Sequence, residues 1–122
     1  MKLYNKDPLE LSDFRYWESK KLYTQLMEEF INGLINGQKF KEKFFQIWRL
    51  NRDKEYSNEE ILKINNEKLI ESKGFSTITS NLFTDCDVFQ PDPSLSRDFE
   101  ISEVELKNSV ERTLLDIKYR YP

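Results

Sequence analysis

Apolar side chains recur along most of this chain at the spacing of amphipathic helices. After Arg15, one apolar residue stands at every fourth position, namely Leu22, Leu26, Phe30 and Leu34, with Tyr23, Met27 and Ile31 beside them. This spacing predicts a helix, which should end in residues 33–37 because they include two glycines and an asparagine. Residues 1–13 are expected to form a loosely held arm, with Ser12 or Asp13 as the helix cap.

A second helix is predicted from about Gln38 to residues 51–53, with one apolar face made of Phe40, Phe44, Ile47 and Trp48. The polar stretch that follows contains the capping box Ser57-Asn58-Glu59-Glu60, which predicts the start of a short helix. Asn65 and Asn66 should weaken or break this short helix. Lys73-Gly74 should end whatever helix precedes it.

A further helix is predicted from apolar residues three or four positions apart: Phe75, Ile78, Leu82, Cys86 and Phe89. Pro91 and Pro93 should stop it, because proline lacks the backbone N–H and clashes with the preceding turn. Residues 90–100 then form a loop rich in turn-forming residues. A second capping box, which begins at Ser102, opens the last helix, whose predicted buried face is Leu106, Val110, Leu114 and Ile117.

These elements predict an all-α fold, a compact antiparallel four-helix bundle with one short extra helix, in a single domain over residues 1–122. The chain has 38% hydrophobic residues to fill one core, and its three glycines and four prolines are few for a β-sandwich. No apolar run reaches the roughly 18 residues that span a bilayer, and residues 1–10 lack the apolar core of a signal peptide. We therefore expect a cytoplasmic protein that does not contact a membrane.

The residue types of common enzyme and metal sites are missing. The chain has no histidine, one cysteine and no glycine-rich phosphate loop. Cys86 is expected to be a small packed residue, and as the single cysteine it excludes an internal disulfide. Asp85-x-Asp87 resembles the start of a calcium loop, but Gln90 stands where that loop needs glycine. We therefore expect no catalysis, no cofactor and no metal ion.

Acidic residues are concentrated in one segment of the chain. Residues 85–105 hold seven acidic residues and one basic residue, a formal charge of −6, whereas the whole chain carries −3. Five of these acids, at the end of a predicted helix and in the loop after it, are candidate contacts to a partner: Asp85, Asp87, Asp92, Asp98 and Glu100. A carboxylate near a helix C-terminus is unfavourable by about 0.3–1 kcal/mol, which a basic partner would offset. A solubilising acidic loop is the other interpretation of this composition.

Basic residues surround the aromatic residues of the second predicted helix: Lys39, Lys41, Lys43, Arg49 and Arg52. We interpret them as a solvated face beside a core stripe, because no basic excess supports binding to nucleic acid. The acidic segment would itself repel nucleic acid and attract basic surfaces. No direct nucleic-acid partner is therefore expected.

The acidic segment lies in a pattern that resembles the colicin D immunity protein family, including the immunity proteins of contact-dependent growth inhibition systems. The pattern consists of Leu82-Phe83, Asp87, Phe89-Gln90-Pro91-Asp92 and Phe99-Glu100-Ile101, followed by the final helix. A weaker match covers residues 22–49. The resemblance implies a four-helix bundle that protects a bacterium from its own toxin, typically a nuclease that cuts tRNA in the anticodon loop.

The resemblance also implies how such a protein acts. It binds the nuclease domain one to one and fills the positive site that would hold phosphates, with Asp87 and Asp92 as the best candidates and Asp85, Asp98 and Glu100 at the flank. The free protein is expected to be a monomer. Gln90 stands where the colicin D inhibitor has an acid, the N-terminal arm is longer, and residues 54–72 resemble an insertion, so the contact-dependent inhibition branch fits better. The alternative is a helical adaptor or regulator that binds another basic protein.

Overall fold

The computed structural model describes residues 8–122, and every extended element of that part is helical. The elements are α1 (Pro8–Trp17), α2 (Lys20–Ile31), α3 (Gly37–Asp53), α4 (Asn58–Lys63), α5 (Asn66–Asp87), the 3-10 turn η1 (Pro93–Leu95) and α6 (Glu103–Arg120). Within these residues no β-strand is present, so the predicted all-α class is confirmed. The described part contains six α-helices, one more than the sequence predicted.

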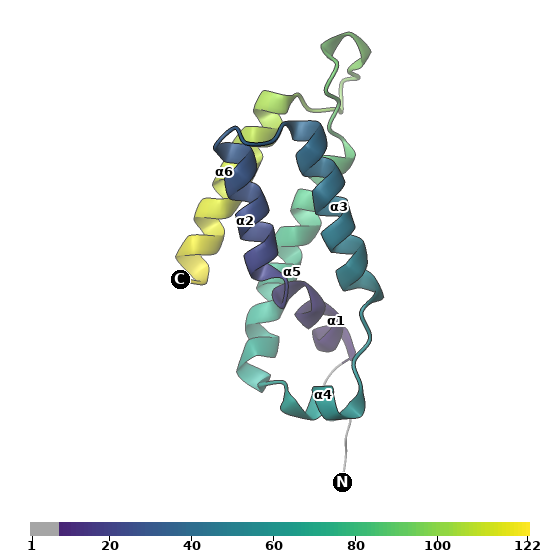
Figure 1. Cartoon of the computed structure of the whole chain (residues 1–122), viewed down its shortest axis with the longest axis vertical. Coiled ribbons are helices and arrows are strands. Elements are labelled where there is room, and N and C mark those ends of the chain that lie inside the picture. Colours follow the sequence, from purple (N-terminus) through teal and green to yellow (C-terminus); the bar gives the residue numbers. More distant parts are fainter. Residues whose placement is uncertain (1–7) are drawn as a thin grey trace.

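The helices α2, α3, α5 and α6 lie side by side along the long axis of the molecule (Figure 1). In this view α2 and α5 run toward the end that carries the α5–α6 loop, and α3 and α6 run back. Helix α1 packs mainly against α5 and also contacts α3. The short α4 lies across the end opposite the loop.

Aromatic rings fill much of the interior between these helices. The rings of Phe30 and Phe40 stack with centroids 4.9 Å apart, and those of Tyr23 and Phe44 lie 5.4 Å apart. Phe75 on α5 is fully buried and lies within 6.1 Å of Tyr23, measured between ring centroids. Offset and tilted ring pairs at these distances add stability beyond their buried area.

Several sequence predictions are confirmed by the positions of the helix ends. Helix α2 ends before residues 33–37, and α3 covers the predicted range. Both capping boxes form, at Ser57 for α4 and at Ser102 for α6. All residues of the predicted stripe from Phe75 to Phe89 are buried, and so is the predicted face of α6.

The predicted N-terminal arm is wrong for residues 8–13, and residues 1–7 lie outside the described part. Pro8 begins α1, a position that suits proline because its missing N–H needs no partner there. Ser12 and Asp13 therefore lie inside a helix and do not cap one. Helices α1 and α2 are separated by a turn at residues 18–19, where the Ser19 hydroxyl accepts a hydrogen bond from Asn51 Nδ2 at 2.6 Å. This contact from α3 is absent from any local pattern, because it joins residues far apart in the chain.

The buried face of α2 is shifted from the predicted stripe. Leu22 is 55% exposed, whereas Tyr23 and Met27 are fully buried. Leu34, at the other end of the predicted stripe, lies beyond the end of α2 and is 73% exposed. Four residues of an α-helix turn about 40° more than a full rotation, so a stripe at every fourth position winds away from the core. The residues beside the predicted stripe, rather than its ends, therefore face the interior.

The prediction that Lys73-Gly74 ends a helix is wrong, because Gly74 lies inside α5. A Cβ at this position would lie 2.7 Å from the Tyr121 hydroxyl, whose ring packs against Phe75. Glycine in a helix interior is less stable than alanine by about 1 kcal/mol. The close approach of the chain's C-terminal end explains why a helix interior accepts it. Asn65, predicted to weaken the short helix, is the N-cap of α5 and accepts from the Glu67 N–H.

Candidate partner-binding site

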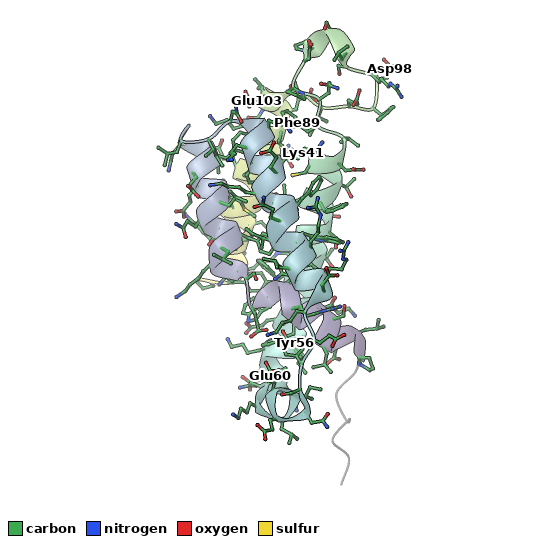
Figure 2. The ribbon with its side chains drawn as sticks, turned by 45° about the vertical axis from the view of Figure 1, so that its right-hand side comes forward. Lys41, Tyr56, Glu60, Phe89, Asp98 and Glu103 are labelled. Atoms are coloured by element: carbon green, nitrogen blue, oxygen red, sulfur yellow. The ribbon has the colours of Figure 1, made fainter. Side chains whose placement is uncertain are left out.

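The loop between α5 and α6, residues 88–102, projects beyond the helix ends in both views (Figures 1 and 2). Its base is closed by two backbone hydrogen bonds, from Gln90 N to Ile101 O at 3.0 Å and from Ile101 N to Val88 O at 2.9 Å. Phe89, at the start of the loop, is only 3% exposed and belongs to the core. The loop is therefore tied to the helices at its base while its tip stands in solvent.

A close junction joins this base to the start of α3. The Gly37 N–H donates to the Glu103 carboxylate, and Figure 2 shows Glu103 and Phe89 together at this end of the molecule. A Cβ at Gly37 would lie 2.7 Å from Phe89 Cζ and 2.8 Å from Glu103 Oε1. Only glycine leaves room for both side chains, so the α2–α3 turn helps to set where the loop leaves the helices.

Polar side chains of the loop brace the loop itself. Asp92 Oδ1 accepts from the backbone N–H of Ser94 at 2.9 Å and from its hydroxyl at 2.7 Å, which caps η1. These hydrogen bonds, that of the hydroxyl above all, lower the pKa of the Asp92 carboxyl. Gln90 Oε1 accepts from Asp92 N at 3.1 Å, and Glu100 Oε1 accepts from Arg97 N at 2.9 Å. The acidic loop is thus a shaped element that its own side chains hold.

The five candidate acids differ in how the structure uses them. Asp85 is half-buried and accepts a hydrogen bond from Ser109 on α6, and Asp92 and Glu100 brace the loop. The side chains of Asp87 and Asp98 are exposed and make no hydrogen bond or ion pair within residues 8–122. The structure therefore brings Asp92, Asp98 and Glu100 into one loop, with Asp87 at its entry and Asp85 turned toward α6. Their role as contacts to a partner stays a prediction.

Two loop residues that are not among the five candidate contacts, one of which is part of the family pattern, are large, apolar and exposed. Leu95 in η1 and Phe99 after it are each 64% exposed. Helical periodicity gives no information about which side chains of a loop are exposed. A signal was nevertheless present, because an apolar residue in a polar loop is unexpected unless it packs on the core or on a partner.

Cys86 and the cations on α3 have structural roles. Cys86 is fully buried, as predicted, and burial raises the pKa of its thiol to about 12, so it is not a thiolate at neutral pH. Lys41 Nζ lies 5.8 Å from the Phe45 ring centroid, and Arg52 Cζ lies 5.6 Å from that of Trp48. These cations cover the edge of the aromatic core on α3.

Neither a metal cluster nor a membrane-spanning helix is found in the described part of the chain. Among residues 8–122 no group of three His, Cys, Asp or Glu side chains could hold a metal ion. No helix in this range is long and apolar enough to cross a bilayer.

In fold and surface, residues 8–122 form a small all-helical protein with a braced acidic loop at one end. The family model described as bacterial self-protective colicin-like immunity matches residues 19–117, which is most of the chain. The chain therefore belongs to the colicin-like immunity family, and membership implies that it neutralises a cognate toxin by binding it. No curated protein and no solved structure matched the chain.

The matched region contains the helices that meet at the acidic loop. It begins at residue 19, so α1 lies outside it, while α2 to α5, the loop and nearly all of α6 lie inside. The projecting loop therefore lies within the matched region, whereas α1 lies before it.

Proposed function

We propose that this protein neutralises a tRNA-cleaving nuclease toxin by inserting the acidic loop, residues 88–102, into the toxin's basic active site. The observation that carries the proposal is the arrangement of the carboxylates. Asp87 and Asp98 are exposed and unpaired among the described residues, and Asp92 uses only Oδ1 for its cap, so its Oδ2 is open. Charges held outward on a braced loop are ready to meet cations without first losing internal partners.

Electrostatics support this mechanism. A nuclease must bind a polyanion, so its active site presents lysine and arginine side chains. Carboxylates pair with these cations through charge-assisted hydrogen bonds, which are about twice as strong as neutral ones. Complementary fields also speed association to about 10⁸–10⁹ M⁻¹s⁻¹ at low salt. Rapid capture protects the producing cell, because free toxin would act at once.

The proposal also includes a scaffold, an oligomeric state and a location for the protein. A four-helix bundle made of α2, α3, α5 and α6, within one domain that covers the whole chain, is the scaffold that presents the loop. The protein is a cytoplasmic monomer that binds one nuclease domain, has no catalytic activity of its own and does not contact nucleic acid directly. The contact-dependent inhibition branch is the proposed source of the toxin, because Gln90, the longer N-terminal segment and residues 54–72 depart from the colicin D pattern.

Charge reversal on the loop tests this proposal. Asp87→Lys combined with Asp92→Lys should abolish protection of bacteria that express the cognate toxin domain, since both lysines would then repel its cations. Immunity proteins of this family are expected to be encoded directly downstream of their toxin, so the gene upstream of this one supplies the toxin domain to test. The matched control is Glu55→Lys combined with Glu111→Lys, which changes net charge equally at exposed positions outside the loop. Circular dichroism checks that each variant stays helical. Full protection by the loop variant would contradict the proposal.

A milder pair of variants separates charge from shape. Asp92→Asn keeps a side-chain oxygen that can cap η1, because asparagine caps as well as aspartate does. Combined with Asp87→Asn, it should slow association with the toxin domain while the loop keeps its conformation. Association of the unchanged protein should also slow as salt is raised, because exposed charges are screened. If neither the double substitution nor the added salt changes the association rate, the charge mechanism is wrong.

A further inference from the structure

The tip of the acidic loop carries two large apolar side chains that the proposed charge mechanism does not use. Leu95 and Phe99 are each 64% exposed, whereas Phe89 at the loop base is 3% exposed. In Figure 2 the neighbouring Asp98 marks this tip, well beyond the helix ends. The apolar residues at the base therefore serve the core, and those at the tip do not.

The shape of the loop does not depend on these two side chains. Its bracing consists of the backbone hydrogen bonds at Ile101 and the polar contacts of Gln90, Asp92 and Glu100. A side chain that is neither buried nor part of the bracing adds little to folding stability. Leu95 and Phe99 are thus available for another role at little structural cost.

Single exposed apolar residues are ordinary on protein surfaces. Leu115 on α6 is an example, at 63% exposed. Leu95 and Phe99 differ because both lie on the braced loop that projects beyond the helix ends (Figure 2), and because Asp98 and Glu100 are the sequence neighbours of Phe99. An aromatic ring between carboxylates offers the two kinds of contact that a single-stranded RNA offers, a stacking face and anionic groups.

We propose that Leu95 and Phe99 are the apolar anchors of the interface with the toxin, an inference that rests on the proposed function. Both enter the toxin's cleft, with Phe99 against the surface on which bases of the RNA substrate stack. The flanking carboxylates meet the phosphate-binding cations around it. Rigid aromatic anchors in desolvated pockets carry much of the binding energy of protein interfaces, and a braced loop loses little entropy on binding.

This arrangement divides the kinetics between two kinds of residue. The exposed carboxylates govern how fast the partners meet, because long-range attraction acts before contact. Buried apolar anchors act only after contact, so they govern how slowly the complex separates. The two contributions can therefore be measured separately on the same complex.

The test compares two double variants by surface plasmon resonance, with the purified upstream-encoded toxin domain as the probe. Leu95→Ser with Phe99→Ser should speed dissociation by at least about tenfold and change the association rate little, because the charges remain. The matched control, Leu115→Ser with Tyr119→Ser, also removes one exposed leucine and one exposed aromatic residue, on α6. It should leave both rates unchanged, and all proteins should unfold at the same temperature.

The outcomes separate this inference from the proposed function. If the unchanged protein and both variants bind with the same dissociation rate, the inference is overturned while the proposed function stands. If the unchanged protein does not bind the toxin domain at all, the proposed function fails and the inference falls with it.

A tryptophan reporter provides a second readout. Phe99→Trp places an exposed indole on the loop tip, and its fluorescence should shift to shorter wavelength when the toxin domain binds and removes it from water. Tyr119→Trp, at a position that is 87% exposed, should show no shift. A complex that forms without any shift from the residue 99 reporter would overturn the anchor role.

Discussion

The two ends of this molecule use similar polar contacts for opposite purposes. At the end that contains α4, Arg15 on α1 donates to the backbone carbonyls of Arg52 and Lys54, and the Tyr56 hydroxyl donates to Glu18. These contacts join segments that are distant in the chain. At the other end, Asp92 and Glu100 contact only their own loop. Figure 2 shows the two ends through Tyr56 and Glu60 on one side and Asp98 on the other.

The difference teaches that contacts between elements stabilise the fold, whereas contacts within one loop shape a surface. An element that packs on several others opens only with much of the domain, and a loop tip that packs on none adds little to global stability. The end with α1 should therefore govern the free energy of unfolding, and the loop end should govern binding. The predictions below challenge this division, from the largest expected effect to the smallest.

Phe75→Ala should cause the largest loss of stability, about 3–5 kcal/mol, because it leaves a cavity among the aromatic rings that join α1 to the other helices. Phe75 is fully buried, and its ring lies 5.8 Å from that of Trp17 between centroids. Denaturant unfolding followed by circular dichroism measures the change. Phe99→Ala is the control in the loop and should change the free energy of unfolding by less than about 0.5 kcal/mol. Equal losses for the two variants would break the comparison.

Gly37→Ala should affect both properties, because it acts at the junction between the helices and the loop base. The added methyl group would press on Phe89 and Glu103, which costs about 1–3 kcal/mol of stability as overpacking. Displacement of the loop base should also weaken binding to the toxin domain in a calorimetric titration. Gly74→Ala is the control. Its added methyl group would meet only the Tyr121 hydroxyl, which is the far end of a side chain and lies away from the loop. Loss of stability with unchanged affinity would show that the loop does not depend on the junction.

The smallest expected effect is a pH dependence confined to the loop tip. The hydrogen bonds from Ser94 lower the pKa of Asp92, so they are fully present above the usual aspartate pKa and are lost as pH falls through the lowered value. The amide resonance of Ser94 should therefore move only below the usual aspartate pKa of about 3.9. Two-dimensional NMR follows this amide during an acid titration.

Ser94→Ala supplies the control for this titration, because the hydroxyl is the main cause of the lowered pKa of Asp92. In this variant the midpoint should rise toward the usual aspartate range while the global unfolding temperature stays the same. If the unchanged protein titrates at the usual aspartate value, the cap on η1 does not hold in solution.

Local chemistry made much of the fold predictable from the sequence. The capping boxes at Ser57 and Ser102 join residues three positions apart, so the sequence displays both partners together. The stripe from Phe75 to Phe89 identified most of α5, and the prolines after it marked the loop. The candidate carboxylates were likewise visible as a concentration of charge, but their individual environments were not.

The sequence by itself therefore determined most of the helical segments, apart from α1 and the first part of α5, and the acidic loop, because these depend on residues within one helical turn or on composition. Only the tertiary structure decided that α1 and α2 are separated at residues 18–19, that Gly74 lies inside α5, and which carboxylates are free. Asn51 reaches Ser19, Tyr121 approaches Gly74, and Ser109 occupies Asp85. Each of these contacts joins positions more than twenty residues apart, and such partners are specified by packing rather than by local pattern.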